Sequence, residues 1–528
     1  MAQKQYAKQL FSCITGIKPL GIRGDDVRIT SLSYDSRTVK KGALFIALPG
    51  IHTDGAAYID AAVQRGAVAV LHQQELEHYH PHICYVKVHD ARSAMAAVAA
   101  CFFDHPSKDL IVIGVTGTEG KTSTVSFIYQ LLRLAGEKAG FFSTASYSFG
   151  DSAVPNPAHQ TTPESITVQE RLAGMRDNGC RYAVVEASSH GLSPRTARLS
   201  HVYFDVAVFM NVTQEHLEFH GTFEQYRYDK AHLFRSLDAH GHRKTAGSVE
   251  PFGVVNSNDP SAAYFAAATQ APVFGFSASP AAEPASNAYT NTLYASDLQE
   301  TEAGLTFTAN EVQNGTVQHI DISVPIAGAF NVYNILAALL VVRRLTQREL
   351  TAFIPLLKQL EPVTGRMCRV HAGQNFELII DYAHTPSSFQ LLLPPIAKRI
   401  RAQGGKVIAV FGSAGERDTV KRPEQGRIAG RYADIIILTD EDPRGEDSVA
   451  LLEMIAAGCP DRKRDEELFI IPDRPQAIRK ACRCAQAGDC VLLLGKGHEN
   501  SIIYKDHTMP YDEYTEAKKI LMELPSSQ

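Results

Sequence analysis

Long apolar runs are missing from this sequence. The apolar segment at residues 335–342 is far shorter than the stretch of about 20 residues that spans a bilayer. Residues 1–8 also lack the apolar core of a secretory signal. These two absences predict a cytoplasmic protein without a membrane partner.

Paired cysteines and an excess of basic charge are also missing. The nine cysteines are scattered and form no Cys-x-x-Cys pair, which favours reduced thiols over disulfides or a zinc site. A net charge of −5 gives no general electrostatic reason to expect nucleic acid as a partner, although a local basic cleft could still hold an anionic ligand. With 45% hydrophobic residues, the composition is that of an ordinary soluble protein.

What the sequence does contain is a repeated alternation of strand-like and helix-like segments. A chain of 528 residues is too long for one hydrophobic core, and this alternation is typical of α/β domains with mostly parallel sheets. Linker-like segments at 104–107 and 361–366 divide it. We predict three domains, 1–107, 108–362 and 363–528, the central one with a phosphate-loop parallel sheet and the last one Rossmann-like.

Two further expectations concern the central domain. Residues 277–286 are rich in small residues and proline, which predicts an exposed loop. Alternating patterns at 305–308 and 320–324 predict an antiparallel addition to the central sheet, and residues 328–334 open a long apolar helix.

The most informative stretch is residues 111–124. An apolar β-branched run leads directly into Gly114, Gly117 and Gly120, then into Lys121 and Thr122 and a helix-like segment. This order predicts a strand, a phosphate loop and a helix, with the lysine reaching a terminal phosphate and Thr122 placed to ligate Mg²⁺. The loop departs from the general pattern at Val115, where the first glycine is expected.

Two later strands end in polar residues that belong near such a loop. The strand at 182–185 is followed by Glu186, and the strand at 206–210 leads into a segment that contains His216 and Lys230. Ligand groups of open α/β sheets gather at the carboxyl ends of the strands. An acid, a histidine and a lysine beside a phosphate loop suit phosphoryl transfer assisted by metal ions.

The third unit has four polar loops that each follow an apolar strand. They lie at residues 381–386, 411–418, 439–447 and 495–499. Because the carboxyl ends of parallel strands meet at one edge, we expect these loops to cluster. Their arginines indicate a second substrate that carries carboxylates.

Taken together, these motifs resemble those of the Mur ligases, the ATP-dependent amide-forming family of peptidoglycan precursor synthesis. The resemblance covers nearly the whole chain, on residues 35–37, 116–122, 161–163, 186–190, 216–230, 331, 381–386, 415–418, 421–423, 442–444 and 495–499. Within the family, the combination is similar to the branch that adds the third residue of the stem peptide. The first domain would then bind the uridine nucleotide, the central one ATP and the last one the amino acid.

The resemblance also implies a role for each matching residue. The UDP-muramoyl peptide would be held by Ser36, Thr161, Thr162, Ser188 and Arg198. ATP would be bound by Gly114, Thr116, Gly117, Thr118, Glu119, Gly120, Lys121, Thr122, Asn331, Arg366 and Asp381. Mg²⁺ would be ligated by Thr122, Glu186, His216 and Lys230, the lysine being converted by CO₂ to a carbamate (N6-carboxylysine). The incoming amino acid would be surrounded by Arg417, Asp442, Arg444, Gly495 and Glu499.

The implied reaction has two steps, with Lys121, Glu186, His216 and Lys230 as the catalytic residues. ATP phosphorylates the D-glutamyl side-chain carboxylate of UDP-N-acetylmuramoyl-L-alanyl-D-glutamate. The amine of a diamino acid then attacks the acyl phosphate, and phosphate leaves. The resemblance further implies a monomer.

Several alternatives stay open in the sequence. Arg195 competes with Arg198 as the substrate arginine, and spacing alone would leave Lys230 an ordinary solvated lysine. Glu119 puts a negative charge into the phosphate loop, which does not help triphosphate binding unless its side chain points away. Two other functions remain: a related ligase that adds glutamate to folates, and a nucleotide-dependent switch or binding module.

The amino acid is also open. Relatives that use meso-diaminopimelate commonly carry Asp-Asn-Pro-Arg, whose arginine grips the second carboxylate of that substrate. This chain carries Glu441, Asp442, Pro443 and Arg444 instead. The arginine fits diaminopimelate, whereas the additional acid favours a simple diamine such as L-lysine or L-ornithine.

Overall fold

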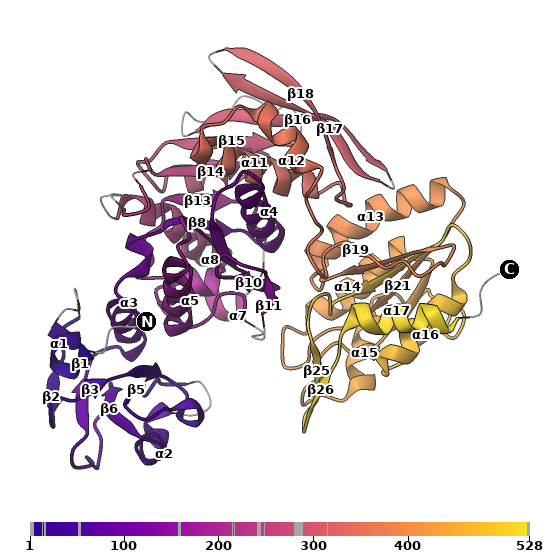
Figure 1. Ribbon diagram of the computed structural model, residues 1–528. Helices are drawn as coiled ribbons and strands as arrows, with labels where there is room; N and C mark the ends of the chain where they lie inside the picture. Colours follow the sequence, from indigo (N-terminus) through magenta and orange to yellow (C-terminus); the bar gives the residue numbers. More distant parts are fainter. Residues whose placement is uncertain are drawn as a thin grey trace. The chain divides into compact units, whose positions relative to one another are not determined.

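The computed structural model of the chain (Figure 1) describes residues 5–12, 14, 17–50, 54–156, 160–213, 215, 217–239, 244–247, 249–278, 289–301, 303–313 and 315–524. His216, Cys13 and most of the predicted loop at 277–286 lie outside the described residues. The chain forms two compact units. The first comprises Met1–Tyr294, Glu311–Gln318 and Ile335–Phe353, and the second comprises Ala295–Asn310, His319–Asn334 and Ile354–Gln528.

The N-terminal part of the first unit is built on a five-stranded sheet with the order β2-β7-β6-β5-β4. Its strands are β2 (Gly21–Arg23), β4 (Ser31–Ser33), β5 (Ala43–Ile46), β6 (Ala67–His72) and β7 (Cys84–Lys87). The strands β4 to β7 are parallel, and β2 closes one edge antiparallel. The helices α1 (Ala7–Ser12) and α3 (Ala91–Phe102) cover one face, while α2 (Ile59–Gln64) covers the other. This confirms the small α/β unit that the sequence predicted.

The largest sheet among the described residues has eleven strands in the order β11-β10-β9-β12-β8-β13-β14-β15-β16-β17-β18. Its strands are β8 (Ile111–Thr116), β9 (Ala139–Phe142), β10 (Ser146–Ser148), β11 (Val154–Pro155), β12 (Tyr182–Glu186), β13 (Val206–Phe209), β14 (Phe252–Asn256), β15 (Val273–Ser277), β16 (Thr290–Thr301), β17 (Gly304–Gln313) and β18 (Thr316–Val324). The run from β9 to β16 is parallel. Every residue of β8 is buried, as expected for a continuous apolar strand covered on both faces.

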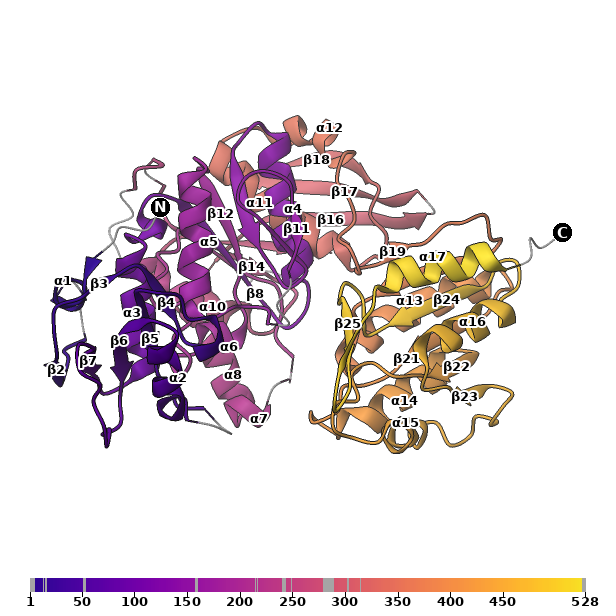
Figure 2. The same cartoon turned by 60° about the horizontal axis from the view of Figure 1, so that its bottom comes forward.

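Helices flank this sheet (Figure 2). They include α4 (Lys121–Leu134), α5 (Ser165–Asp177), α6 (Ser189–Leu192), α7 (Leu217–His220), α8 (Phe223–Lys230), α9 (His232–Arg235), α10 (Ala262–Ala266) and α11 (Asn331–Thr346). The apolar side chains of α5, α8, α9 and α10 share one core with β12 and β13. The long apolar helix predicted after residue 328 is α11.

The predicted addition to the central sheet is present. The two alternating patterns lie in β17 and β18, which follow β16 at one edge of the sheet. The strand that connects them to the rest of the sheet, β16, pairs with β15 in parallel, with Phe274 opposite Thr290. Twelve residues separate the two strands, from Ala278 to Tyr289, and a connection of about that length lets the chain return to the same end of the sheet. The alternating pattern indicated strands correctly, but it carried no information about their partner.

The C-terminal domain is a doubly covered parallel sheet with the order β19-β20-β24-β21-β22-β23. Its strands are β19 (Cys368–Arg369), β20 (Glu377–Asp381), β21 (Val407–Phe411), β22 (Ile435–Leu438), β23 (Leu468–Ile470) and β24 (Cys490–Leu494), and only β19 is antiparallel. The helices α13 (Pro386–Ala402), α14 (Lys421–Tyr432) and α15 (Ser448–Ala456) cover one face. The helices α16 (Arg474–Cys484) and α17 (Glu513–Glu523) lie side by side on the other (Figure 2).

These observations confirm the predicted α/β class with a central parallel sheet and a Rossmann-like final domain. The domain ends at 107 and 362 stay predictions. The eight cysteines of the described residues are all free, as expected for reduced thiols. No helix among the described residues is long and apolar enough to cross a membrane.

Candidate active site

The phosphate loop lies between β8 and α4. Gly120 forms the N-cap of α4 with φ +83°, a left-handed conformation that favours glycine. The backbone N–H of Thr118 donates to the Asn211 carbonyl over 2.9 Å, and that of Glu119 donates to Asn211 Oδ1 over 2.8 Å, which holds the loop against the end of β13. Lys121 Nζ donates to the Thr118 carbonyl over 2.8 Å. A helix N-terminus and a lysine at one loop suit a phosphate group.

The glycines of this stretch are required for different structural reasons. Gly114 lies inside β8, where a Cβ would come within 2.5 Å of a methyl carbon of Leu233. Gly117 follows the strand, and a Cβ there would lie 2.9 Å from Cβ of Met210. Gly114 thus serves the packing of the strand, and the loop itself starts at Gly117. Thr116 is buried, and its hydroxyl has no hydrogen-bond partner among the described residues.

Glu186 ends β12, the strand beside β8, and only 1% of it is exposed. The Thr122 hydroxyl lies 3.0 and 3.1 Å from its two carboxylate oxygens. The backbone N–H and the hydroxyl of Thr144 donate to the same carboxylate over 2.7 and 3.0 Å. The predicted meeting of this acid with the phosphate loop is therefore present.

Lys230 ends α8 and is 1% exposed. Its Nζ donates to the Gly117 carbonyl over 2.7 Å and lies 4.6 Å from the ring centre of Tyr226. The Tyr226 hydroxyl in turn lies 3.1 Å from Thr118 Oγ1. Burial, followed by the nearby charge of Lys121, lowers the pKa of Lys230 well below its ordinary value. This lysine is therefore a buried member of the phosphate-loop environment, not a solvated one.

A buried network holds α8 from its other side. His220 Nδ1 lies 2.8 Å from Asp229 Oδ2, and His220 Nε2 lies 3.1 Å from Ser189 Oγ. Burial acts to raise the pKa of Asp229, but hydrogen bonds from His220 and its other neighbours outweigh it and lower that pKa. The network connects the residue before Lys230 to the segment that follows Glu186.

The candidate metal ligands have the right chemistry for Mg²⁺. Thr122 and Glu186 offer hydroxyl and carboxylate oxygens, which are the hard donors this ion prefers. Lys230 could add oxygens only as a carbamate. Among the described residues no group of three His, Cys, Asp or Glu side chains could hold a metal, and His216 lies outside them. The residues present fit an ion that also takes oxygens from a bound nucleotide.

The predicted muramoyl-peptide residues meet beside Glu186. The Thr162 hydroxyl donates to the Glu186 carbonyl over 3.0 Å and receives hydrogen bonds from the Ser188 N–H and hydroxyl over 3.0 and 2.9 Å. Arg198 donates to the Thr162 carbonyl over 3.0 Å and to Glu164 Oε1 over 2.8 and 3.1 Å. The geometry groups Arg198, rather than Arg195, with this cluster.

The other predicted residues of this set, and the rival Arg195, lie in different surroundings. Arg195 places its guanidinium 4.8 Å from the ring centre of Phe219. Thr161 is half-buried next to Thr162, and Ser36 starts a short 3-10 helix in the N-terminal domain. Near Ser36, Tyr34 has a raised pKa because of burial and then the charge of Glu164. Arg92 of α3 places a guanidinium nitrogen 3.9 Å from Glu164 Oε2, so the N-terminal domain reaches the same acid that Arg198 contacts.

The other predicted nucleotide residues belong to the second unit. Asn331 begins α11, with its amide N–H donating to the Ala327 carbonyl over 2.7 Å. Asp381 ends β20 and accepts from the N–H groups of Met367 and Ala383, both over 2.8 Å. Burial raises the pKa of Asp381, while the charge of Arg366 acts against the rise.

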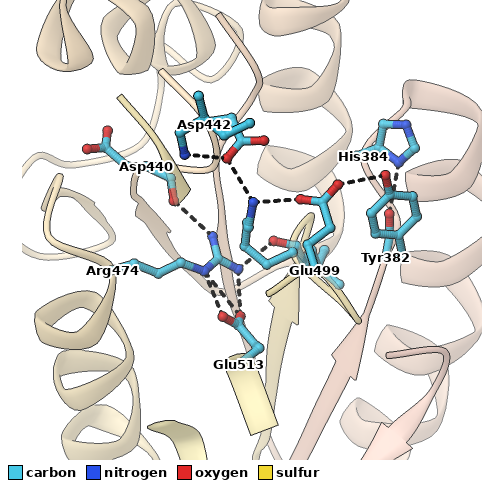
Figure 3. Close-up of polar contacts among 10 residues, drawn as sticks. Tyr382, His384, Asp440, Asp442, Arg474, Glu499 and Glu513 are labelled. Carbon is cyan, nitrogen blue, oxygen red and sulfur yellow. Dashed lines mark hydrogen bonds and ion pairs between the residues drawn. The ribbon is translucent and has the colours of Figure 1, made fainter. Parts of the chain in front are cut away.

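All four predicted loops of the C-terminal domain follow parallel strands and gather at one edge of its sheet. Figure 3 shows residues of three of these loops, and the Gly415 N–H of the fourth donates to the Asp442 carbonyl over 2.8 Å. Lys496 is fully buried, and its Nζ donates to Asp442 Oδ1 over 2.9 Å and to Glu499 Oε2 over 2.6 Å. The Tyr382 hydroxyl donates to Glu499 Oε1 over 3.0 Å. The predicted residues Asp442 and Glu499 therefore lie together, joined by a lysine that the sequence analysis did not single out.

Glu441 and Gly495 are in close contact at the same edge. Gly495 has φ +98°, and a Cβ on it would lie 2.7 Å from Glu441 Oε2. That oxygen is buried without a hydrogen-bond partner among the described residues, and burial raises the pKa of Glu441. Arg444 donates its backbone N–H to the Ile503 carbonyl over 2.9 Å, whereas Arg417 is exposed.

Sequence reasoning missed a second buried pair at this edge, Arg474 and Glu513 (Figure 3). Neither residue stands in a recognisable motif. In the sequence, Lys496 is distinguished only by its place between two glycines. Arg474 is distinguished only by its place next to the helix-capping Asp473.

A phosphate loop with an acid and a buried lysine, together with a second parallel sheet that presents a polar edge, defines a nucleotide-using α/β enzyme with two further ligand regions. Comparison with known proteins specifies the class. The family profiles that match are the Mur ligase family catalytic domain at residues 28–103, the Mur ligase middle domain at 115–342 and the Mur ligase glutamate ligase domain at 365–497.

Relatives match over almost the whole chain. The UDP-N-acetylmuramyl-tripeptide synthetase of Treponema denticola is 56% identical over 532 residues, with 98% of both chains covered. The UDP-N-acetylmuramoyl-L-alanyl-D-glutamate–2,6-diaminopimelate ligase of Geobacillus thermodenitrificans is 37% identical over 501 residues, covering 95% of this chain and 96% of the relative. A solved structure of a ligase with the latter name aligns with a TM-score of 0.59 and 27% identity over 99% of both chains.

The chain belongs to the Mur ligase family, whose members are ATP-dependent amide-forming ligases of peptidoglycan synthesis. The resemblance predicted from the sequence is thereby confirmed.

Proposed function

We propose that this protein joins a diamino acid to UDP-N-acetylmuramoyl-L-alanyl-D-glutamate with hydrolysis of ATP to ADP and phosphate. The observation that carries the proposal is the convergence of Thr122, Glu186 and Lys230 at the phosphate loop, beside the Thr162, Ser188 and Arg198 cluster. The names of its relatives support the same reaction.

In the first step, the γ-phosphoryl group of ATP passes to the D-glutamyl side-chain carboxylate, and ADP leaves. Lys121 and the N-terminus of α4 stabilise the charge on the phosphates. Residues Gly114 to Thr122 contact the phosphates or support the loop that contacts them. Asn331, Arg366 and Asp381 bind the rest of the nucleotide.

Thr122 and Glu186, with His216 and Lys230, would hold Mg²⁺, and this ion would supply positive charge near the phosphates. Lys230 would contribute as a carbamate formed with CO₂. Carbamate formation needs a neutral amine, and the lowered pKa of Lys230 favours that form.

The UDP-muramoyl peptide lies between the N-terminal and central domains. Ser36 binds its uridine nucleotide, and Thr161, Thr162, Ser188 and Arg198 bind its peptide. The contact between the Thr162 hydroxyl and the Glu186 carbonyl supports this assignment, because it joins the peptide site to the strand that carries the catalytic acid.

In the second step, the amine of the amino acid attacks the acyl carbon, and phosphate is expelled as the amide forms. Asp442, Gly495 and Glu499, with Arg417 and Arg444, bind that amino acid. Two alternatives remain for the identity of that amino acid. If Arg444 makes a charge-assisted contact with a second carboxylate, the substrate is meso-diaminopimelate. If the acids Glu441 and Asp442 set the specificity, the substrate is L-lysine or L-ornithine. We also propose that the enzyme acts as a cytoplasmic monomer.

The test is phosphate release by the purified protein with ATP, Mg²⁺ and UDP-N-acetylmuramoyl-L-alanyl-D-glutamate. Meso-diaminopimelate, L-lysine and L-ornithine are added singly, and the product is identified by mass. Product with diaminopimelate alone would assign Arg444 the role of reading a second carboxylate. Product with a simple diamine would assign specificity to the acids. No product with any of them would refute the proposed function.

A further inference from the structure

Arg474 and Glu513 form a fully buried ion pair between two helix starts. Arg474 is the first residue of α16, Glu513 is the first residue of α17, and both side chains are 0% exposed. The guanidinium donates to both carboxylate oxygens of Glu513 at distances of 2.6, 2.9 and 3.2 Å (Figure 3).

The same guanidinium also holds two main-chain carbonyls. It donates to the Asp440 carbonyl over 3.2 Å and to the Leu494 carbonyl over 2.8 Å (Figure 3). Leu494 is the last residue of β24, and Asp440 lies two residues beyond the end of β22. Since β21 lies between these strands, Arg474 ties together two strand ends that share no ladder hydrogen bonds.

The two tied ends open the loops that carry the candidate amino-acid residues. Asp442 follows Asp440 by two positions, and Glu499 follows Leu494 by five. Lys496 then joins the carboxylates of Asp442 and Glu499. The two carboxylates joined by Lys496 therefore belong to the two loops at whose starts Arg474 holds a carbonyl.

Stabilisation of α16 does not account for Arg474 at its first position. A cation in the first turn of a helix opposes the helix dipole, and burying an ion pair costs solvation that its attraction barely offsets. Burial acts to lower the pKa of Arg474, but the Glu513 carboxylate outweighs it and raises that pKa, which keeps the guanidinium charged. Only a charged, forked donor can hold both carbonyls and the carboxylate at once.

We propose that the Arg474–Glu513 pair positions the amino-acid subsite by fixing the ends of β22 and β24, and so the placement of Asp442 and Glu499. Arg474 is a positioning residue, since it acts through these two acids. The inference rests on the proposed function in so far as Asp442 and Glu499 bind the amino acid.

The main variant is the double substitution Arg474→Met with Glu513→Leu. Replacing both members of a buried ion pair by apolar residues of similar volume often leaves stability unchanged. Removing only one member leaves the other as an unpaired buried charge. Arg474→Lys is the conservative variant, which keeps the charge but loses the fork. The matched control is Arg399→Met with Glu377→Leu, a two-bond pair (2.6 and 2.9 Å) in the same domain, whose Glu377 begins β20 at the opposite edge of the sheet.

Steady-state kinetics with each of meso-diaminopimelate, L-lysine and L-ornithine measure the effect. We expect the Arg474→Met/Glu513→Leu protein to raise the KM for the accepted amino acid at least tenfold, with the KM values for ATP and the UDP-muramoyl dipeptide within twofold of wild type. The amino-acid KM of Arg474→Lys should lie between those of wild type and the double variant. The control pair should leave all three KM values within twofold of wild type. An unchanged amino-acid KM in the folded double variant would overturn the inference.

Hydrogen exchange separates this inference from the proposed function. The amides of Arg444 and Glu499 are hydrogen-bonded to the carbonyls of Ile503 and Lys496. We expect both to exchange at least tenfold faster in the double variant and not in the control. If the wild-type protein forms no product with any of the amino acids, the proposed function is refuted. If exchange at both amides is unchanged in the double variant, the positioning role is refuted, whether or not the wild-type protein forms product.

Discussion

Lys230 and Gly117 are joined by a 2.7 Å hydrogen bond from the buried Lys230 Nζ to the main-chain carbonyl, across 113 positions of sequence. This contact fixes α8 against the phosphate loop. It also places a lysine whose pKa is lowered by burial and by Lys121 next to the residues that would bind phosphate. Four predictions follow from this contact and from three others in the structure.

Replacing Lys230 by alanine should lower the rate of product formation by about 100- to 1,000-fold, the usual effect of removing one transition-state charge partner. Lys230→Arg should be equally slow, because a guanidinium forms no carbamate. Added formate should restore part of the activity of Lys230→Ala, since it supplies carboxylate oxygens. Steady-state rates and the mass of the intact wild-type protein in bicarbonate test this, and an unimpaired Lys230→Ala protein would contradict it.

Replacing Thr122 by valine should weaken the apparent affinity for Mg²⁺ by roughly 10- to 100-fold. The variant removes a hydroxyl that lies 3.0 Å from Glu186 while keeping the shape of the side chain. Thr122→Ser keeps the hydroxyl and serves as the control. Activity is titrated with Mg²⁺ at saturating ATP, and equal Mg²⁺ dependence of the valine and serine variants would rule out a metal role for Thr122.

Replacing Arg198 by alanine should raise the KM for the UDP-muramoyl dipeptide about tenfold, which corresponds to about 1.4 kcal/mol of lost binding. Arg198 contacts the Thr162 carbonyl and Glu164, while Arg195 lies over the ring of Phe219. Arg195→Ala is therefore the matched control, with a KM within threefold of wild type. The reverse order of the two variants would return the substrate role to Arg195.

Replacing Glu441 by glutamine should give a protein whose unfolding free energy exceeds that of wild type by an amount that grows as pH rises. Folding raises the pKa of Glu441 by burial, so the folded state holds its proton more tightly than the unfolded state. The unfolding free energy of wild type therefore falls as pH rises from the ordinary pKa of 4.5 through the raised value. The variant lacks this loss, which amounts to about 1.4 kcal/mol for each tenfold change in proton affinity.

Urea unfolding at pH 4, 5.5 and 7 measures this difference between Glu441→Gln and wild type. The advantage of the variant should be absent at the lowest pH and largest at pH 7. Glu453→Gln provides the control, because the Glu453 side chain is 52% exposed. A variant advantage that shrinks as pH rises would contradict the direction of the pKa change.

The sequence determined the features that depend on neighbours along the chain. The run from Ile111 to Thr122 specified the strand, phosphate loop and helix, because an apolar β-branched run and a glycine-rich turn each act over a few residues. The four loops at one edge of the C-terminal sheet followed from strand and helix alternation, since parallel strands place their carboxyl ends together. Glu186 was predicted beside the phosphate loop for the same reason.

Only the tertiary structure decided which distant side chains meet. Strand order brings β24 next to β20 and β21, so Lys496 joins Asp442 and Glu499, and Arg474 reaches two strand ends that no spacing rule relates. The parallel pairing of β16 and the choice of Arg198 over Arg195 at the Thr162 cluster also depend on contacts between separate elements. Such pairings depend on burial and on the distances between atoms, which one-dimensional patterns do not contain.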